Sequence, residues 1–366
     1  MCHYEWAQLE SAPPVMSAEQ ARRMDLRILT IETSCDETAA AIVTDQLEVL
    51  SSVVASQDQL HERFHGVVPE IAARAHVERI LPVIDEALRR ANIELNDLDG
   101  IAVANTPGLA GSLLVGVTAA KALCVATGKP LLAVNHLHAH MYACQIALHQ
   151  NIFPCIGFIV SGGHTHLYHC ASATEFRYLG GNIDDAAGEA FDKIAAMLGL
   201  PYPGGPSVSK AATAGNAKKH AFPRPFLRDR NRLAFSFSGL KTAVRYAIAG
   251  TGKVDFQSLQ LTEQQIADVA ASFQAAVIDC LVGKAMLAID QTRLSRLCVG
   301  GGVAANTVFR ERLTETCQQN GIELHIAPLQ LCTDNAIMGG LAIEHLKAGR
   351  QETLDLDVLP GLVRGS

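Results

Sequence analysis

The feature that most constrains the fold is a strand–turn–strand pattern that occurs twice along the chain. The first copy joins the apolar segments 28–33 and 39–44 through a short polar turn, and the second joins 155–162 to 164–172 through a glycine turn. A further strand segment follows each copy, and helical segments then alternate with buried strands. This alternation is typical of α/β domains. We therefore predict an α/β fold of two topologically duplicated lobes with a nucleotide cleft between them.

Composition limits the classes of function. The chain has 366 residues, of which 49% are hydrophobic, so it can bury a large core and is better accommodated as two domains than as one. The net charge of −7 excludes a general polyanion binder, and nucleic-acid contact would need a local patch. The densest cationic stretch contains Lys218, Lys219, Arg224, Arg228, Arg230 and Arg232. It is a candidate polyanion contact, although a solvated charge run has the same composition.

Cysteine usage and hydropathy bear on the cell compartment. The ten cysteines form no C-x-x-C pair and lie mostly in apolar runs, as reduced core cysteines of cytosolic proteins do. The longest apolar stretch, 111–128, contains Lys121, and we predict no membrane span. The first 24 residues lack the apolar core of a signal peptide. We predict a cytoplasmic protein, with Met24 as the functional start and residues 1–23 as a loose extension.

Two histidines and a distant aspartate are the strongest candidates for metal ligands. His136 and His140 are four residues apart, so on a helix they project from one face, as a metal requires. Asp334 begins a predicted helix over 333–349 and would complete a ligand set with open positions. Core or capping histidines and an N-cap aspartate remain the alternatives. His138 points away from the pair, and Leu137 stands where a zinc peptidase would carry its glutamate base.

Polar and glycine-rich turns supply the remaining candidate residues. Asp36 lies in the first turn. It is a candidate carboxylate for orienting a substrate or transferring a proton, and the alternative is an ordinary turn residue. Gly162 and Gly163 free the backbone of the second turn to approach an anion, although a plain hairpin turn fits as well. Asn306 ends a glycine run after a strand and is a candidate for a ribose or base-edge contact. Asp192, on one face of a predicted helix, is a further candidate functional residue. The alternative is that this face of the helix is simply exposed to solvent.

Ten motifs occur in a fixed order along the chain: IETSCDET, GVVPEIAARAH, PGLAGSLLVG, NHLHAH, VSGGHT, DDAAGEAFDK, YPGGP, FSFSGLKT, GGGVAAN and TDNAIMGG. Together they resemble the TsaD family of tRNA adenosine threonylcarbamoyltransferases, from about residue 28 to 349. The resemblance implies the actin-like ASKHA fold, which is RNase H-like. It also implies metal-assisted transfer of threonylcarbamoyl from threonylcarbamoyl-AMP to N6 of the adenosine 3′ of the anticodon. The tRNAs concerned read codons beginning with A, and AMP is released.

The resemblance also assigns roles to residues and implies partners. It makes His136, His140 and Asp334 the ligands of one divalent transition metal, iron or zinc, and Asp36 the catalytic carboxylate. The substrate-binding positions that it implies are Ile159, Val160, Ser161, Gly162, Gly163, Asp192, Gly205 and Asn306. The implied partners are tRNA, a TsaB-type paralogue and a TsaE-type ATPase. His138 and Thr106 depart from residues common in the family, at positions that are not ligands.

These observations predict a domain organisation. The first lobe is expected over 24–134 and the second lobe, with helical insertions, over 135–330. Residues 331–366 are expected to form a C-terminal helix that returns to the metal site, and a tail. Three other functions are alternatives for a chain with these motifs. They are a small-molecule kinase or ATPase of the same fold, a zinc peptidase, and a non-catalytic scaffold in a tRNA-modification complex.

Overall fold

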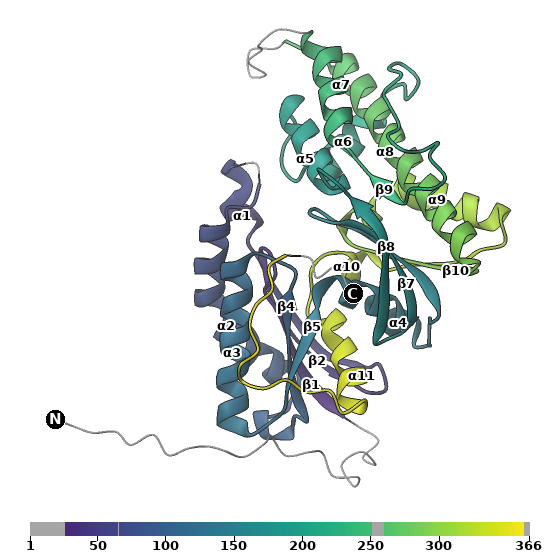
Figure 1. The fold of residues 1–366 in the computed structure, drawn as a ribbon. Helices are drawn as coiled ribbons and strands as arrows, with labels where there is room; N and C mark the ends of the chain where they lie inside the picture. The colour runs from purple at the N-terminus through teal and green to yellow at the C-terminus, as the bar shows by residue number, and fades with distance from the viewer. Residues whose placement is uncertain (1–25, 65, 251–259, 362–366) are drawn as a thin grey trace.

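The computed structural model describes residues 26–64, 66–250 and 260–361, and these residues form two lobes (Figure 1). The predicted extension 1–23 lies outside the described residues. The first lobe is built on a five-stranded sheet in the order β3-β2-β1-β4-β5. Its strands are β1 Arg27–Glu32, β2 Glu37–Thr44, β3 Val49–Ser56, β4 Gly100–Thr106 and β5 Leu131–Asn135. The first three strands are antiparallel, and β4 and β5 join β1 in parallel.

Helices cover both faces of the first sheet. On one face, α2 (Pro69–Ala91) and α3 (Ala110–Thr127) bury Ile80, Val83, Val117 and their neighbours against the strands. On the other face lie the C-terminal helices η6 (Ile337–Leu341) and α11 (Ala342–Lys347). The short elements α1 (Asp58–His61), η2 (Glu62–Phe64) and η3 (Leu95–Asp97) complete this lobe.

The second lobe repeats this arrangement with a six-stranded sheet in the order β11-β10-β6-β7-β8-β9. Its strands are β6 Cys155–Val160, β7 Thr165–Ser172, β8 Glu175–Asn182, β9 Ala234–Phe235, β10 Arg296–Gly300 and β11 Glu323–Ile326. Its helices are α5 Ala187–Met197, α6 Gly204–Ala212, α7 Ser238–Ala249, α8 Glu263–Thr292, η5 Gly302–Ala305, α9 Thr307–Gln319 and α10 Leu329–Cys332. In each lobe, a hairpin is followed by a third antiparallel strand, and a later strand joins the first in parallel. The predicted duplicated α/β fold is confirmed.

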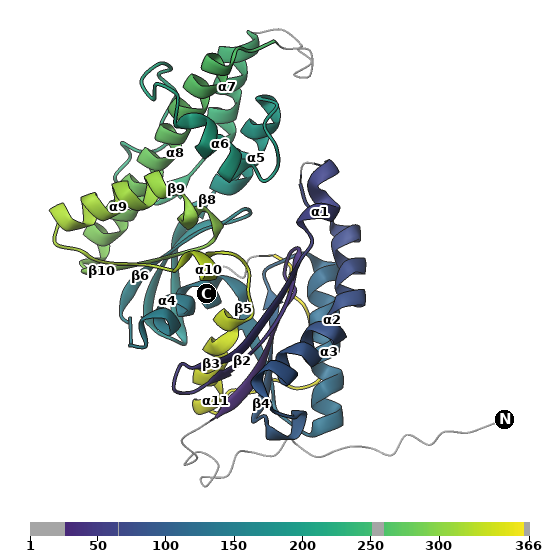
Figure 2. The same ribbon diagram turned by 180° about the vertical axis from the view of Figure 1, so that it is seen from behind.

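Helix α4 (His136–Leu148) lies between the two sheets (Figures 1 and 2). Leu137, Met141 and Cys144 pack into the core of the second lobe, whereas Ala139 and Ala143 pack against the first. Because α4 packs on the cores of both lobes, most of its residues are buried, and the helix carries the histidine pair between the two sheets.

The C-terminal segment differs from the single helix predicted over 333–349. The chain turns at Asp334 and continues as η6 and then α11. Asn335 Oδ1 accepts the N–H of Met338, and a Cβ on Gly339 would lie 2.9 Å from Thr30 Cβ. Gly339 thus lies in the 3₁₀ segment η6 at a point where the backbone packs closely on β1 and leaves no room for a side chain. Asp334 lies in the turn and caps no α-helix, so the N-cap interpretation was wrong.

Two helices, α3 and α8, are long and apolar enough to cross a membrane by length and composition alone, although the sequence predicted no such segment. Most of α8 is buried in the second lobe. Helix α3 packs its buried face on the first sheet. Both helices therefore have places in the fold, and a long core helix meets the same criterion.

Candidate functional site

Three ligand atoms from distant parts of the chain meet beside α4. His136 is the first residue of this helix, and the Asn135 side chain fixes the helix start by accepting the N–H groups of Leu137 and His138. Asp334 comes from the turn after α10. Its Oδ1 lies 3.5 Å from His136 Nε2 and 3.3 Å from His140 Nε2. One ligand atom from each of the three residues lies within 4.8 Å of the others.

The burial and bonding of His140 test whether these residues fit a metal ion. Its side chain is fully buried, and neither ring nitrogen has a hydrogen-bond partner among the described residues. The contact between Nε2 and Asp334 therefore lacks hydrogen-bond geometry. A buried polar atom without a partner is costly, and a cation between the two imidazoles and the carboxylate would supply one. The donor set fits a divalent transition metal such as zinc or iron.

Glu32, at the end of β1, was missed by the sequence reasoning. Its Oε2 lies 3.1 Å from His136 Nδ1, and Ser34 Oγ lies 3.1 Å from the same nitrogen. These contacts are on the side of the ring opposite the nitrogen that faces Asp334. The signal that could have found Glu32 is that it is the one charged residue in the apolar segment 28–33, because a buried charge needs a partner.

The electrostatics of the site follow from these contacts. Burial favours neutral His136, but the carboxylates of Asp334 and Glu32 outweigh it and raise the pKa of this imidazole to about 9. Burial likewise disfavours ionised Asp334, but the nearby His136 and His140 hold the pKa of its carboxyl well below its usual range. Burial and then the imidazoles of His166 and His136 lower the pKa of His164 to about 3. His164 is therefore a neutral imidazole close to this charged group.

The β6–β7 turn presents open backbone. The side chains of Ile159 and Val160 are fully buried, so only their backbone can face a ligand. Gly162 and Gly163 are exposed, and a Cβ on either would meet nothing within 4 Å. Throughout the part of the chain that the structure describes, their N–H groups donate to no protein atom. The turn rests on the start of α5, where Glu189 N–H donates to the carbonyl of Gly162 at 2.9 Å.

Asp36 lies in a cluster of carboxyl groups at the turn between β1 and β2. It is nearly buried, and its side chain lies within 4.8 Å of those of Glu37 and Asp58. Burial, followed by the charges of Asp334 and Asp36, raises the pKa of Glu37 to about 10. Burial and the neighbouring carboxylates thus favour the protonated form of Glu37.

Asp192 and Gly205 lie where α5 and α6 meet. Asp192 Oδ1 accepts the N–H of Gly204 at 2.7 Å. Burial raises the pKa of Asp192 to about 6, and the charge of Asp36 acts in the same direction. A Cβ on Gly205 would meet nothing within 4 Å. The first turn and α5 are therefore close enough for their carboxylates to interact.

The side-chain amide of Asn306 is committed to protein contacts. Its Nδ2 donates to Ser209 Oγ at 2.8 Å and to Gln274 Oε1 at 2.9 Å. Its Oδ1 accepts the N–H of Phe309 and caps α9. These contacts join α9 to α6 and α8, and they leave the amide no free donor for a ribose.

The cationic segment 218–232 runs along α8, which holds it in place. Arg224 pairs with Asp279, Arg230 pairs with Asp290, and the Arg232 guanidinium lies over the Phe226 ring. The buried Lys284 donates to two carbonyls of the segment. Lys218, Lys219 and Arg228 are exposed and belong to no ion pair formed by the described residues. These three are the cations of the segment that have neither an ion-pair partner nor a ring contact among the described residues.

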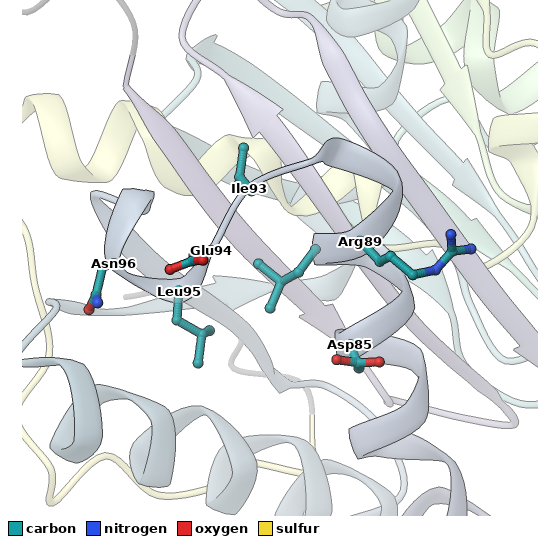
Figure 3. Close-up of a pocket in the computed structure, with 7 residues that line it drawn as sticks. Asp85, Arg89, Ile93, Glu94, Leu95 and Asn96 are labelled. Atoms are coloured by element: carbon teal, nitrogen blue, oxygen red, sulfur yellow. The ribbon is translucent and has the colours of Figure 1, made fainter.

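A separate hollow lies at the C-terminal end of α2 (Figure 3). Its walls include Asp85, Arg89 and Glu94. It contains none of the residues expected in the site.

Comparisons with known proteins agree on one family. A family model described as TsaD, tRNA N6-adenosine threonylcarbamoyltransferase, matches residues 48–341. A protein of that name from Rhodopirellula baltica is 57% identical over 92% of this chain and 97% of its own length. Another, from Moorella thermoacetica, is 48% identical over 92% of this chain and 97% of its own length.

Solved structures share the fold at low identity. The HypF protein of T. kodakarensis has a TM-score of 0.61 at 14% identity, covering 89% of this chain and 48% of its own. A full-length HypF in a phosphate- and nucleotide-bound form has a TM-score of 0.57 at 14% identity, covering 88% and 46%. This likeness concerns the two-lobed ASKHA fold alone.

Proposed function

Because the chain belongs to the TsaD family of tRNA N6-adenosine threonylcarbamoyltransferases, we propose that its acyl donor is threonylcarbamoyl-AMP. The acceptor is N6 of the adenosine 3′ of the anticodon, in tRNAs that read codons beginning with A. The new bond joins N6 to the carbamoyl carbon, the bond from that carbon to the phosphate oxygen breaks, and AMP leaves.

One observation carries the proposal: two imidazoles and a carboxylate converge, and the buried His140 has no hydrogen-bond partner among the described residues. His136, His140 and Asp334 would hold one divalent ion, zinc or iron. Such an ion, when bound, would polarise the adenylate as a Lewis acid and offset its negative charge.

The chain's own groups support the remaining tasks. The free N–H groups of Gly162 and Gly163 can hold the phosphate, since nothing in the described part of the protein occupies them. Asp36 is the carboxylate that we propose accepts the proton lost from N6, because it lies at the turn beside Ser34, which contacts His136. The adenosine must leave its stack in the anticodon loop to reach these groups.

We propose that the chain acts in the cytoplasm with a TsaB-type paralogue and a TsaE-type ATPase. Two apolar side chains on α2, Val77 and Leu81, are 64% and 65% exposed. They lie one turn apart on the helix and form a small apolar surface that a partner protein could cover. The net charge of −7 also favours a partner that contributes to tRNA binding.

Mass spectrometry of tRNA nucleosides from a depletion strain tests the proposed function. Depletion should remove threonylcarbamoyladenosine from tRNA, and a copy of the wild-type gene should restore it. The double variant His136→Ala, His140→Ala should not restore it, although the protein accumulates. An unchanged nucleoside level after depletion would contradict the proposal.

A further inference from the structure

Glu32 is a buried carboxylate whose bonding is directed at one metal ligand. It is 3% exposed, and it forms no ion pair with any lysine or arginine of the described residues. Its Oε1 accepts the N–H of Ser34 at 2.6 Å, which fixes the carboxylate in place. Its Oε2 lies 3.1 Å from Nδ1 of His136. Burying a carboxylate is costly unless a partner compensates, and His136 is the partner that the fold supplies.

The contact selects one arrangement of protons on the imidazole. An ionised carboxylate can only accept hydrogen bonds, so Nδ1 must carry hydrogen where it meets Glu32. Ser34 Oγ lies at the same distance from Nδ1, but a hydroxyl can donate or accept and so permits either tautomer. In neutral His136, a hydrogen on Nδ1 leaves the lone pair on Nε2. This is the nitrogen that faces Asp334 and His140.

We propose that Glu32 is a positioning residue that holds His136 in the tautomer able to bind the metal through Nε2. The inference rests on the proposed metal site but adds a residue that touches neither metal nor substrate. By accepting the hydrogen bond of Nδ1, the negatively charged carboxylate also increases the electron density of the imidazole ring, which makes Nε2 a stronger ligand. Partners of this kind typically change metal affinity by about 10- to 100-fold.

The test compares the zinc affinity of Glu32→Gln, Ser34→Ala and a control, Asp99→Asn, with that of the wild type. Zinc is the only metal added, and it competes between the protein and a chromophoric chelator. Glu32→Gln keeps the size of the side chain but loses the charge and can present an amide N–H to Nδ1. We expect zinc to bind about 10- to 100-fold more weakly to this variant. Ser34→Ala removes the other partner of Nδ1 and should change affinity by less than about threefold, because the Glu32 carboxylate still selects the tautomer.

Asp99→Asn is the control for loss of a carboxylate at the other end of β1, where Asp99 Oδ2 accepts the N–H of Arg27. It should bind zinc as the wild type does. Thermal unfolding of the chelator-treated proteins separates an effect on folding from an effect on the ligand. If Glu32→Gln does not fold, Glu32→Asp keeps the charge but shortens the reach, and it should still weaken zinc binding.

The outcomes separate this inference from the proposed function. If folded Glu32→Gln binds zinc as tightly as the wild type, the positioning role is overturned and the transfer function stands. If the wild type and the His136→Ala, His140→Ala variant bind zinc equally, the metal site itself is wrong and the role of Glu32 falls with it.

Discussion

Single residues differ in whether the fold leaves their polar groups available to a ligand. His140 is fully buried, and neither ring nitrogen has a hydrogen-bond partner among the described residues. The exposed N–H groups of Gly162 and Gly163 donate to no protein atom in the same part of the chain. The amide of Asn306, by contrast, makes three hydrogen bonds to protein. Burying a polar group without a hydrogen-bond partner costs free energy, so such a group is typical of a position where a ligand supplies the missing contact.

The open space at Gly163 leads to a prediction about substrate binding. A Cβ there would meet nothing within 4 Å, and Gly163 is not among the glycines with positive φ. Gly163→Val should therefore fold with normal stability, yet its side chain would occupy the approach to the free N–H groups. We expect affinity for threonylcarbamoyl-AMP, measured by calorimetry, to fall at least about tenfold, or about 1.4 kcal/mol.

Gly239→Val is the matched control, because Gly239 is also open to solvent but lies in α7, away from the turn. It should bind the adenylate as the wild type does. Normal affinity in Gly163→Val would show that the phosphate binds elsewhere.

The raised pKa of Asp192 predicts a pH dependence of stability. Burial raises the pKa of this carboxyl to about 6, so the folded state resists its ionisation. Stability contributed by the protonated form is complete below the unfolded pKa of about 4 and is lost as pH rises to about 6. Asp192→Asn does not lose stability in this way, because an amide does not ionise over this pH range. Its free energy of unfolding, relative to the wild type, should rise by at most about 3 kcal/mol between pH 4 and 7.

Urea denaturation at a series of pH values measures this difference. Asp355→Asn, at an exposed position whose carboxylate has no hydrogen-bond or ion-pair partner among the described residues, serves as the control. A relative stability of Asp192→Asn that does not change with pH would show that Asp192 ionises normally.

At the scale of elements, the cationic segment shows how folding changes the meaning of a sequence pattern. Six basic residues stand close together in the sequence, but α8 supplies Asp279 and Asp290 as partners for two of them. Arg232 is engaged with Phe226. The sequence could not reveal the two ion pairs, because the aspartates lie more than 50 residues away.

The exposed cations of this segment carry the prediction about tRNA. Lys218, Lys219 and Arg228 replaced together by Ala should weaken tRNA binding and lower the slope of log affinity against log salt. The expected change in slope is about 0.7–0.9 for each phosphate that the variant no longer neutralises. Filter binding over a series of salt concentrations measures it.

Arg312→Ala, which removes an exposed cation from α9, is the control. Affinity for threonylcarbamoyl-AMP should stay unchanged in all these variants. A salt slope equal to that of the wild type in the triple variant would place the tRNA surface elsewhere or on a partner.

Elements differed in how far the sequence alone could predict them. The predicted strands 28–33 and 39–44 lie within two residues of β1 and β2, because buried apolar strands on either side of a polar turn leave a clear pattern. The segment after Asp334 was predicted as one helix. It instead bends so that Gly339 can pack on Thr30, a contact across about 300 residues that no local pattern contains.

For the whole molecule, duplication explains both the fold and the place of the site. Each lobe begins with a hairpin whose turn carries small and polar residues, and α4 lies between the sheets. The duplicated strand pattern was visible in the sequence, and so was the histidine pair. The part played by Glu32 was not, because it depends on the distance between the end of β1 and the start of α4.

The central claim is that the cluster of His136, His140 and Asp334 holds a metal that transfer to tRNA requires. The direct test measures metal content and transfer in the same preparations, purified without chelator and supplied with any partner proteins, threonylcarbamoyl-AMP and unmodified tRNA. The wild type should contain about one transition-metal ion per chain and form threonylcarbamoyladenosine. The His136→Ala, His140→Ala variant should fold, contain no metal and form none. Full transfer by this metal-free variant would contradict the account.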